Sequence, residues 1–141
     1  MIGGGLPSLA LFDSGCAALP SVGHDPTDSR GGRAGAVDGQ FDDGGALLVL
    51  HRLDDTQIAS VEVGVAKART AAIFRRPSKV FEDQVKNGRV AALGLPGAAP
   101  LQGGIPIVHR GKVVGAIGVS GNTPQEDEDI AKAGANALSD R

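Results

Sequence analysis

Residues 111–138 read GKVVGAIGVSGNTPQEDEDIAKAGANAL, and this stretch decides the fold of the chain. Its first part, residues 113–119, predicts a β-strand. The residues TPQE at 123–126 then form a capping box with proline at the first helical position. They predict a final helix that runs nearly to the end of the chain. Its apolar residues are Ile130, Ala133, Ala137 and Leu138.

More strands are predicted on the N-terminal side of this stretch. Residues 105–109 predict a strand, and Gly111 lies in the turn to the strand that follows, as in a hairpin. Farther upstream, DDGG at 42–45 is a turn signal that precedes the apolar run ALLVL. We expect a strand at about 46–52 and a damaged partner strand before Asp42.

Two helices are predicted between these strands. The first begins at Asp54 and Asp55, whose charges suit the positive end of the helix dipole, and ends near Phe74. The second runs from Pro77 to Lys86, and the dipeptide Asn-Gly that follows ends it with a left-handed cap. The apolar stripe of the first helix consists of Ile58, Val61, Val65, Ala68 and Ala72.

The predicted order of elements is strand, helix, helix, strand, strand, helix. Hairpin connections imply an antiparallel sheet flanked by helices, which is an α+β fold. Residues 42–141 form this domain. Residues 1–41 hold nine glycines and three prolines and show no sustained helical or strand period. We therefore expect residues 1–41 to be an irregular linker or tail.

The composition argues against several classes of protein. The chain of 141 residues has 22 glycines without a G-X-Y period, so it is not collagen, and it lacks the long apolar run of a membrane-spanning helix. A net charge of −2 and 3% aromatic residues give little basis for binding nucleic acid. Cys16 stands alone, so neither an internal disulfide nor a cysteine-based metal site is expected. Since no signal peptide is recognised, we expect a cytoplasmic protein.

The glycine-rich stretch GAIGVSG at 115–121 resembles a phosphate loop only in part. Its spacing is not the dinucleotide fingerprint, and Gly115 and Gly118 fall inside a predicted strand. The simpler interpretation is a strand whose glycines let a helix or a ligand come close. Gly121 and Thr123 precede a helix N-terminus, where a carboxylate or phosphate can dock.

A basic cluster lies where the two central helices meet. Arg75 and Arg76 end one predicted helix and precede the next, with Lys67, Arg69 and Lys79 nearby in sequence. Two interpretations stay open. The cations complement the dipole at a solvated helix end, or they bind an anion such as a carboxylate or a tetrapyrrole propionate.

Three histidines are present, and His24 lies in the irregular segment. His51 and His109 lie on or at the ends of strands. No two share the spacing of a zinc site, whereas either strand histidine has the chemistry to ligate a haem iron. The commoner alternative is a solvent-facing strand residue. The acidic run at 126–129 fits helix capping, with a weak surface metal site as the alternative. No nucleophile and base pair is visible, so enzymatic activity is left open and disfavoured.

Four stretches in this order resemble one known family: DDGG at 42–45, KARTAAIFRRPS at 67–78, LPGAAPLQGGIPIV at 95–108, and the stretch at 111–138. Together they resemble the GlcG/HbpS haem-binding family, formerly a domain of unknown function. The C-terminal domain of some corrinoid adenosyltransferases is similar. The resemblance covers residues 42–138. Residues 1–36 depart from it, because they lack the amphipathic helix with which family members begin, and residues 37–41 read as a poor strand.

The resemblance implies a profilin-like or roadblock-like fold and a homo-oligomer, either a dimer or an octamer. It implies a small-ligand binding protein with haem or another tetrapyrrole as its ligand, and no nucleic-acid or membrane partner is expected. One alternative is an accessory protein or enzyme of small hydroxy-acid or diol catabolism, and another is an oligomeric structural module. The candidate ligand-binding residues are Arg75, Arg76, Gly103, Gly104, Gly118, Ser120, Gly121 and Thr123. No catalytic residue or metal ligand is assigned.

Overall fold

The computed structural model describes residues 37–139. Within that range a four-stranded sheet is combined with α-helices and a short 3-10 helix. The strands are β1 (Val37–Asp42), β2 (Leu47–Arg52), β3 (Gly104–His109) and β4 (Lys112–Ser120). The helices are α2 (Ser60–Phe74), α3 (Lys79–Lys86), the 3-10 helix η1 (Val90–Gly94) and α4 (Pro124–Ser139).

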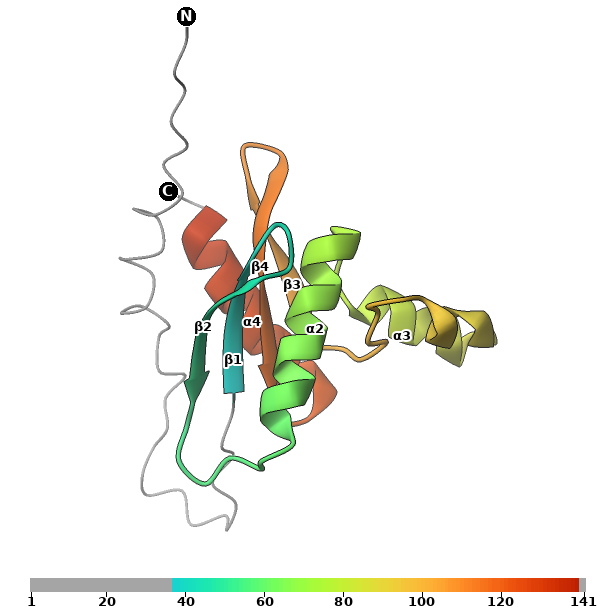
Figure 1. The fold of residues 1–141 in the computed structure, drawn as a ribbon, viewed down its shortest axis with the longest axis horizontal. Helices are drawn as coiled ribbons and strands as arrows, with labels where there is room; N and C mark the ends of the chain where they lie inside the picture. The colour runs from blue at the N-terminus through green and yellow to red at the C-terminus, as the bar shows by residue number, and fades with distance from the viewer. Residues whose placement is uncertain (1–36, 140–141) are drawn as a thin grey trace, which may run out of the picture.

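The four strands form one antiparallel sheet in the order β2-β1-β4-β3. Figure 1 shows α2 in front of the sheet and α4 behind it, so the sheet is the middle of three layers. α2 packs on β1, β3 and β4, and α4 packs on β3 and β4. α3 projects to one side of these layers. The structure confirms the predicted α+β fold, an antiparallel sheet flanked by helices.

β1 is the element on which sequence and structure differ most. The sequence places residues 37–41 in the irregular segment, yet they form an interior strand that pairs with both β2 and β4. Val37 and Phe41 are 0% and 1% exposed. Pairing on both sides and burial therefore outweigh the weak β propensity of Asp38 and Gly39. The predicted partner strand before the turn is confirmed, and residues 1–36 of the irregular segment lie outside the described residues.

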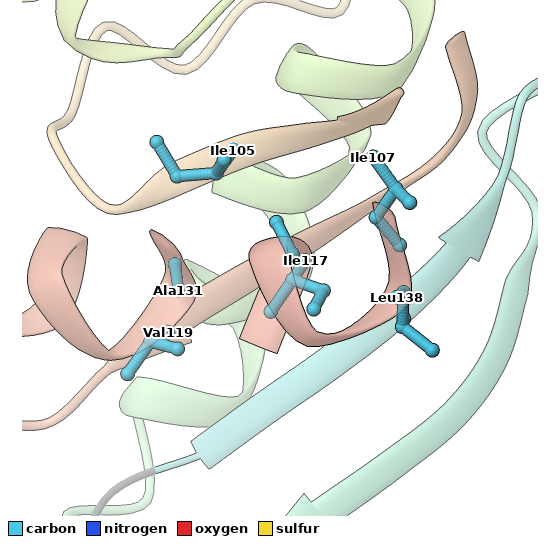
Figure 2. Packing of buried hydrophobic residues seen from close by; sticks show 7 residues of the cluster. Ile105, Ile107, Ile117, Val119, Ala131 and Leu138 are labelled. Atoms are coloured by element: carbon cyan, nitrogen blue, oxygen red, sulfur yellow. The ribbon is translucent and has the colours of Figure 1, made fainter. Parts of the chain in front are cut away.

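Each face of the sheet has its own apolar cluster. Figure 2 shows the cluster on the α4 side, where Ile117 and Val119 of β4 pack with Ile105 and Ile107 of β3 and with residues of α4. The cluster on the α2 side consists of Phe41, Ala68, Ala71, Ala72 and Ala116. Alanines dominate this second cluster, so α2 can lie close to the strands.

α2 begins at Ser60 and not at Asp54, which corrects the predicted start. Asp55 has φ of 61°, a left-handed conformation that a helix cannot contain. The Thr56 hydroxyl donates to the Leu53 carbonyl at 2.6 Å and closes a turn there. Ile58, predicted in the apolar stripe, precedes the helix and is 82% exposed. None of the helices in residues 37–139 is long and apolar enough to cross a membrane.

The predicted hairpin turn and the predicted capping box near the C-terminus are both confirmed. Arg110 and Gly111 have φ of 49° and 75° and join β3 to β4 as a tight hairpin. At the start of α4, the Thr123 hydroxyl donates to Glu126 Oε2 at 2.7 Å, and the Thr123 N–H donates to the same oxygen at 3.1 Å. These two hydrogen bonds lower the pKa of Glu126 below its ordinary value.

Candidate functional site

Six of the eight candidate residues gather at the end of the sheet where β3 begins and β4 ends. Gly104 pairs with Gly118 across these two strands, and the Val119 N–H donates to the Gly103 carbonyl at 3.0 Å. The six are Gly103, Gly104, Gly118, Ser120, Gly121 and Thr123. A ligand-binding role for them stays a prediction.

The glycines at 104 and 118 are positions of close contact with α2. A Cβ atom at Gly104 would lie 2.1 Å from the Lys67 carbonyl oxygen. At Gly118 it would lie 2.3 Å from the Gly64 carbonyl oxygen and 2.5 Å from the Ala68 nitrogen. The helix backbone therefore fills the space beside both glycines, which agrees with the simpler interpretation of the glycine-rich strand.

Lys67 lies beside these glycines and forms a buried ion pair. Its Nζ donates to Asp127 Oδ2 at 2.7 Å and to the Val119 carbonyl at 3.0 Å. The two charged side chains are 5% and 3% exposed. Asp127 Oδ1 accepts the Asn122 N–H at 3.0 Å. Lys67 is therefore not part of a surface basic cluster, contrary to its grouping with the arginines from sequence.

Arg75 and Arg76 lie elsewhere on the molecule. Both are exposed at the C-terminal end of α2, where Arg75 is the left-handed cap with φ of 54°. Arg75 follows Ala68 by seven residues, or about 10 Å along the helix axis at 1.5 Å per residue. The structure thus separates the two arginines from the six residues at the end of β4. Anion binding by the arginines stays a prediction.

His51 forms a cross-strand pair with Asp38. The two residues lie opposite each other in the β1–β2 ladder, and His51 Nδ1 is 4.0 Å from Asp38 Oδ2. The imidazole is 63% exposed, whereas the carboxyl is 11% exposed. Burial raises the pKa of Asp38 above its ordinary value, and the nearby His51 lowers it in part.

The Asp38–His51 pair lies on the α4 side of the sheet. Asp38 pairs across the ladder with Val119, which belongs to the apolar cluster beneath α4. Residues that pair in an antiparallel sheet project on the same face. His51 is therefore on the opposite face from α2, and at the end of the sheet where β4 leads into α4.

His109 lies at the other end of the sheet. It pairs with Lys112, seven residues along β4 from Val119, so the two strand histidines are about 23 Å apart along the sheet at 3.3 Å per residue. One iron cannot be ligated by both within one chain. Among residues 37–139, no carboxylate forms an ion pair with His109.

A polar cluster between α3 and the strand β3 has no signal in the sequence. Ser78 Oγ donates to the Leu101 carbonyl at 2.5 Å and accepts the Gly104 N–H at 2.8 Å. Glu82 Oε2 accepts the Gln102 N–H at 2.5 Å. Burial opposes ionisation of Glu82, but hydrogen bonds from Lys86 and from the Gln102 N–H lower its pKa overall. These contacts hold the loop before β3 in place.

The acidic run at 126–129 is less exposed than its place in a first helical turn suggests. Asp127 and Glu128 are buried, and Glu128 Oε1 pairs with Lys132 while Glu128 Oε2 is buried without a hydrogen-bond partner. Within the described part of the chain, no three His, Cys, Asp or Glu side chains are placed to hold a metal ion.

The family model described as "Haem degrading protein HbpS-like" matches residues 39–136, from β1 to α4. The chain belongs to the HbpS-like family. The resemblance found in the sequence is therefore confirmed, and the match begins three residues earlier than expected, at Gly39 in β1.

Two relatives and one solved structure show how far the similarity extends. GlcG of Escherichia coli K12 is 47% identical to this HbpS-like protein over 79 residues, or 56% of this chain and 59% of GlcG. The matched part of the chain thus spans only 59% of the length of GlcG. An uncharacterised 15.0 kDa protein of Citrobacter freundii, from the dhaT-dhaS intergenic region, is 33% identical over 70% of this chain and 72% of that protein. The structure of a double mutant of Streptomyces reticuli HbpS is 26% identical, with a TM-score of 0.75 over 98% of this chain and 90% of that one.

Proposed function

We propose that this protein binds a small ligand and that the ligand is haem or another tetrapyrrole. The observation that carries the proposal is the family match, whose description names haem, over residues 39–136. The match covers every strand and helix that the structure describes. It omits only the first two residues of β1 and the last three residues of α4. The proposal therefore concerns the folded domain as a whole.

Haem requires a ligand for its iron and favours cations or hydrogen-bond donors for its propionates. The described residues offer both kinds of group. His51 presents an exposed imidazole beside a carboxylate, a common arrangement for a metal-binding histidine. Arg75 and Arg76 are exposed guanidinium groups, which can grip carboxylates with two hydrogen bonds. Each group on its own therefore supplies one of the two kinds of contact that hold a haem.

These two groups provide alternative places for one haem. The arginines end α2 on one face of the sheet, and His51 lies on the other face. Gly64 of α2 packs beside Val37, which precedes Asp38 in β1. Arg75 lies eleven residues farther along α2 than Gly64. That is about 16 Å along the helix axis. Since the sheet also stands between them, one haem cannot contact both groups of the same chain.

Thermal or denaturant unfolding with and without haemin tests the proposed function. A ligand that binds only the native state stabilises it by about 2.7 kcal/mol when its free concentration is 100 times the dissociation constant. We expect this stabilisation with haemin and a smaller one with an unrelated aromatic dye. Equal stability with and without haemin at every concentration would contradict binding.

We also propose that the protein is a homo-oligomer, a dimer or an octamer. The support is that three apolar side chains after α3 are exposed: Val90 is 62%, Leu93 56% and Leu101 43% exposed. Burial of exposed apolar side chains in an interface favours association. Light scattering after gel filtration should give a mass above that of one chain. The substitution Leu93→Asp should lower that mass, and a monomeric wild-type protein would contradict the proposal.

A further inference from the structure

The pairing of β1 with β2 fixes a histidine and a carboxylate side by side. Asp38 and His51 are direct cross-strand partners, so their Cβ atoms are held about 5 Å apart by the sheet itself. The backbone around Asp38 pairs on both sides and is not free to shift. The position of the carboxylate is therefore set by the fold, while the exposed imidazole can rotate.

The orientation of the imidazole leaves one ring nitrogen available. Nδ1 is the atom nearest the carboxylate, 4.0 Å from Asp38 Oδ2, so Nε2 on the far side of the ring points away from Asp38. A hydrogen bond needs about 2.9 Å, so the exposed ring would move about 1 Å closer to Asp38 when it donates. A metal-binding histidine typically donates its other N–H to a carboxylate in this way. The donor fixes the tautomer and makes the ligating nitrogen more basic.

The buried carboxylate gains from such an arrangement. The Asp38 side chain is 11% exposed, and an ionised group at such a site is unfavourable unless a donor satisfies it. An imidazole bound to iron through Nε2 has a more acidic N–H at Nδ1 and is a stronger donor. Ligation at His51 would therefore also stabilise the charge of Asp38.

We propose that His51 is the protein ligand to the haem iron and that Asp38 is its positioning residue. This inference rests on the proposed function and decides between the two placements of the haem. It puts the haem on the α4 side of the sheet, at the β1–β2 edge. His109 does not share the site, because it lies about 23 Å away and lacks an ion pair with a carboxylate in residues 37–139.

Absorption spectra of the ferric complexes test the assignment. The full chain and the variants His51→Ala, Asp38→Asn and His109→Ala are each titrated with haemin. His51 is 63% exposed, so its removal should leave folding intact, which circular dichroism checks. We expect His51→Ala to shift the Soret band and to weaken haemin binding more than any other single variant. His109→Ala is the matched control and should give the wild-type spectrum and affinity.

Asp38→Asn separates a positioning role from a merely structural one. Loss of the partner of a metal-binding histidine typically weakens binding about tenfold to a hundredfold. A less basic imidazole also donates less charge to ferric iron, so the reduction potential of the bound haem should rise. A purely structural effect would weaken binding without moving the potential of the haem that remains bound.

Three results would overturn the assignment. If the wild type binds haemin and His51→Ala has the same spectrum and affinity, His51 is not the ligand, while the proposed function stands. If Arg75→Ala/Arg76→Ala weakens binding and His51→Ala does not, the haem lies at the α2 end instead. If the wild type shows no saturable change, the proposed function fails and the iron ligand with it.

Discussion

Lys67 and Asp127 join the two helical layers through a buried ion pair at the end of the sheet. The Nζ of Lys67 in α2 is 2.7 Å from Oδ2 of Asp127 in α4, and the two side chains are 5% and 3% exposed. The remaining carboxylate oxygen of Asp127 accepts the Asn122 N–H, and Lys67 also donates to the Val119 carbonyl. The pair thus fixes α2, the end of β4 and the start of α4 relative to one another.

Lys67→Met should destabilise the protein by about 3–5 kcal/mol, because it leaves the Asp127 carboxylate buried without its cation. Urea unfolding followed by circular dichroism measures the change. The double variant Lys67→Met/Asp127→Leu removes both charges and should be clearly more stable than the single variant. A single variant within about 0.5 kcal/mol of the wild type would show that the pair is not buried in solution.

Gly118→Ala should destabilise the protein by about 3 kcal/mol, because the added methyl would lie 2.3 Å from the Gly64 carbonyl oxygen. Gly94→Ala is the matched control, since a Cβ there meets no atom within 4 Å. The free energies of unfolding of both variants are compared with that of the wild type. If Gly118→Ala lowers the free energy of unfolding no more than Gly94→Ala does, the backbone of α2 is not in close contact with Gly118 of β4.

Asp38→Asn should make the free protein more stable at neutral pH. Burial raises the pKa of this carboxyl in the native state above its ordinary value of 3.8. The stability that its protonated form supplies is complete below the unfolded pKa and is lost as the pH rises through the native pKa. The free energy of unfolding of the variant should therefore equal that of the wild type at about pH 3 and exceed it at about pH 8.

The stability of the Asp38→Asn variant without haem is also a control for its haemin binding. A variant that is more stable without haem and yet binds haemin more weakly cannot owe the weaker binding to unfolding. Equal pH dependence of unfolding in the two proteins would contradict the burial of this carboxyl.

Thr123→Ala should cost about 1 kcal/mol, because it removes the side-chain half of the capping box at the start of α4. Glu126 has a lowered pKa in the native state, so its contribution is present above its unfolded pKa and is lost as the pH falls through the native value. The difference between the two proteins should therefore shrink in acid. A difference that is the same at acid and neutral pH would mean that Glu126 does not take part in the cap.

Local signals in the sequence predicted most of the fold. The capping box at Thr123, the Arg110-Gly111 hairpin and the apolar run of β2 each depend on neighbours in the chain, and each lies where the pattern placed it. For β1 the only local signal was the turn that follows it, because its own residues read as irregular. Its stability comes from pairing with β2 and β4, and β4 is more than 70 residues away in the sequence. The bounds of such a weak strand and its interior place in the sheet are recognised only when its partners are known.

The candidate site was harder to predict for the same reason. The sequence grouped Lys67 with Arg75 and Arg76 by proximity along the chain, but the side chain of Lys67 turns to Asp127, 60 residues away. The Asp38–His51 pair depends on the register of two strands, one of which read as irregular. Six of the predicted residues do lie together, because the Gly-rich strand and the loop before β3 are paired by the sheet.

Haemin titration of the full wild-type chain, followed in the Soret region, tests the central claim most directly. The chain contains neither Trp nor Tyr, so its own near-ultraviolet absorbance interferes little. We predict a saturable change that ends at one haem per chain or per dimer. A change that rises linearly with haemin and never saturates would contradict the proposal that this HbpS-like protein binds haem.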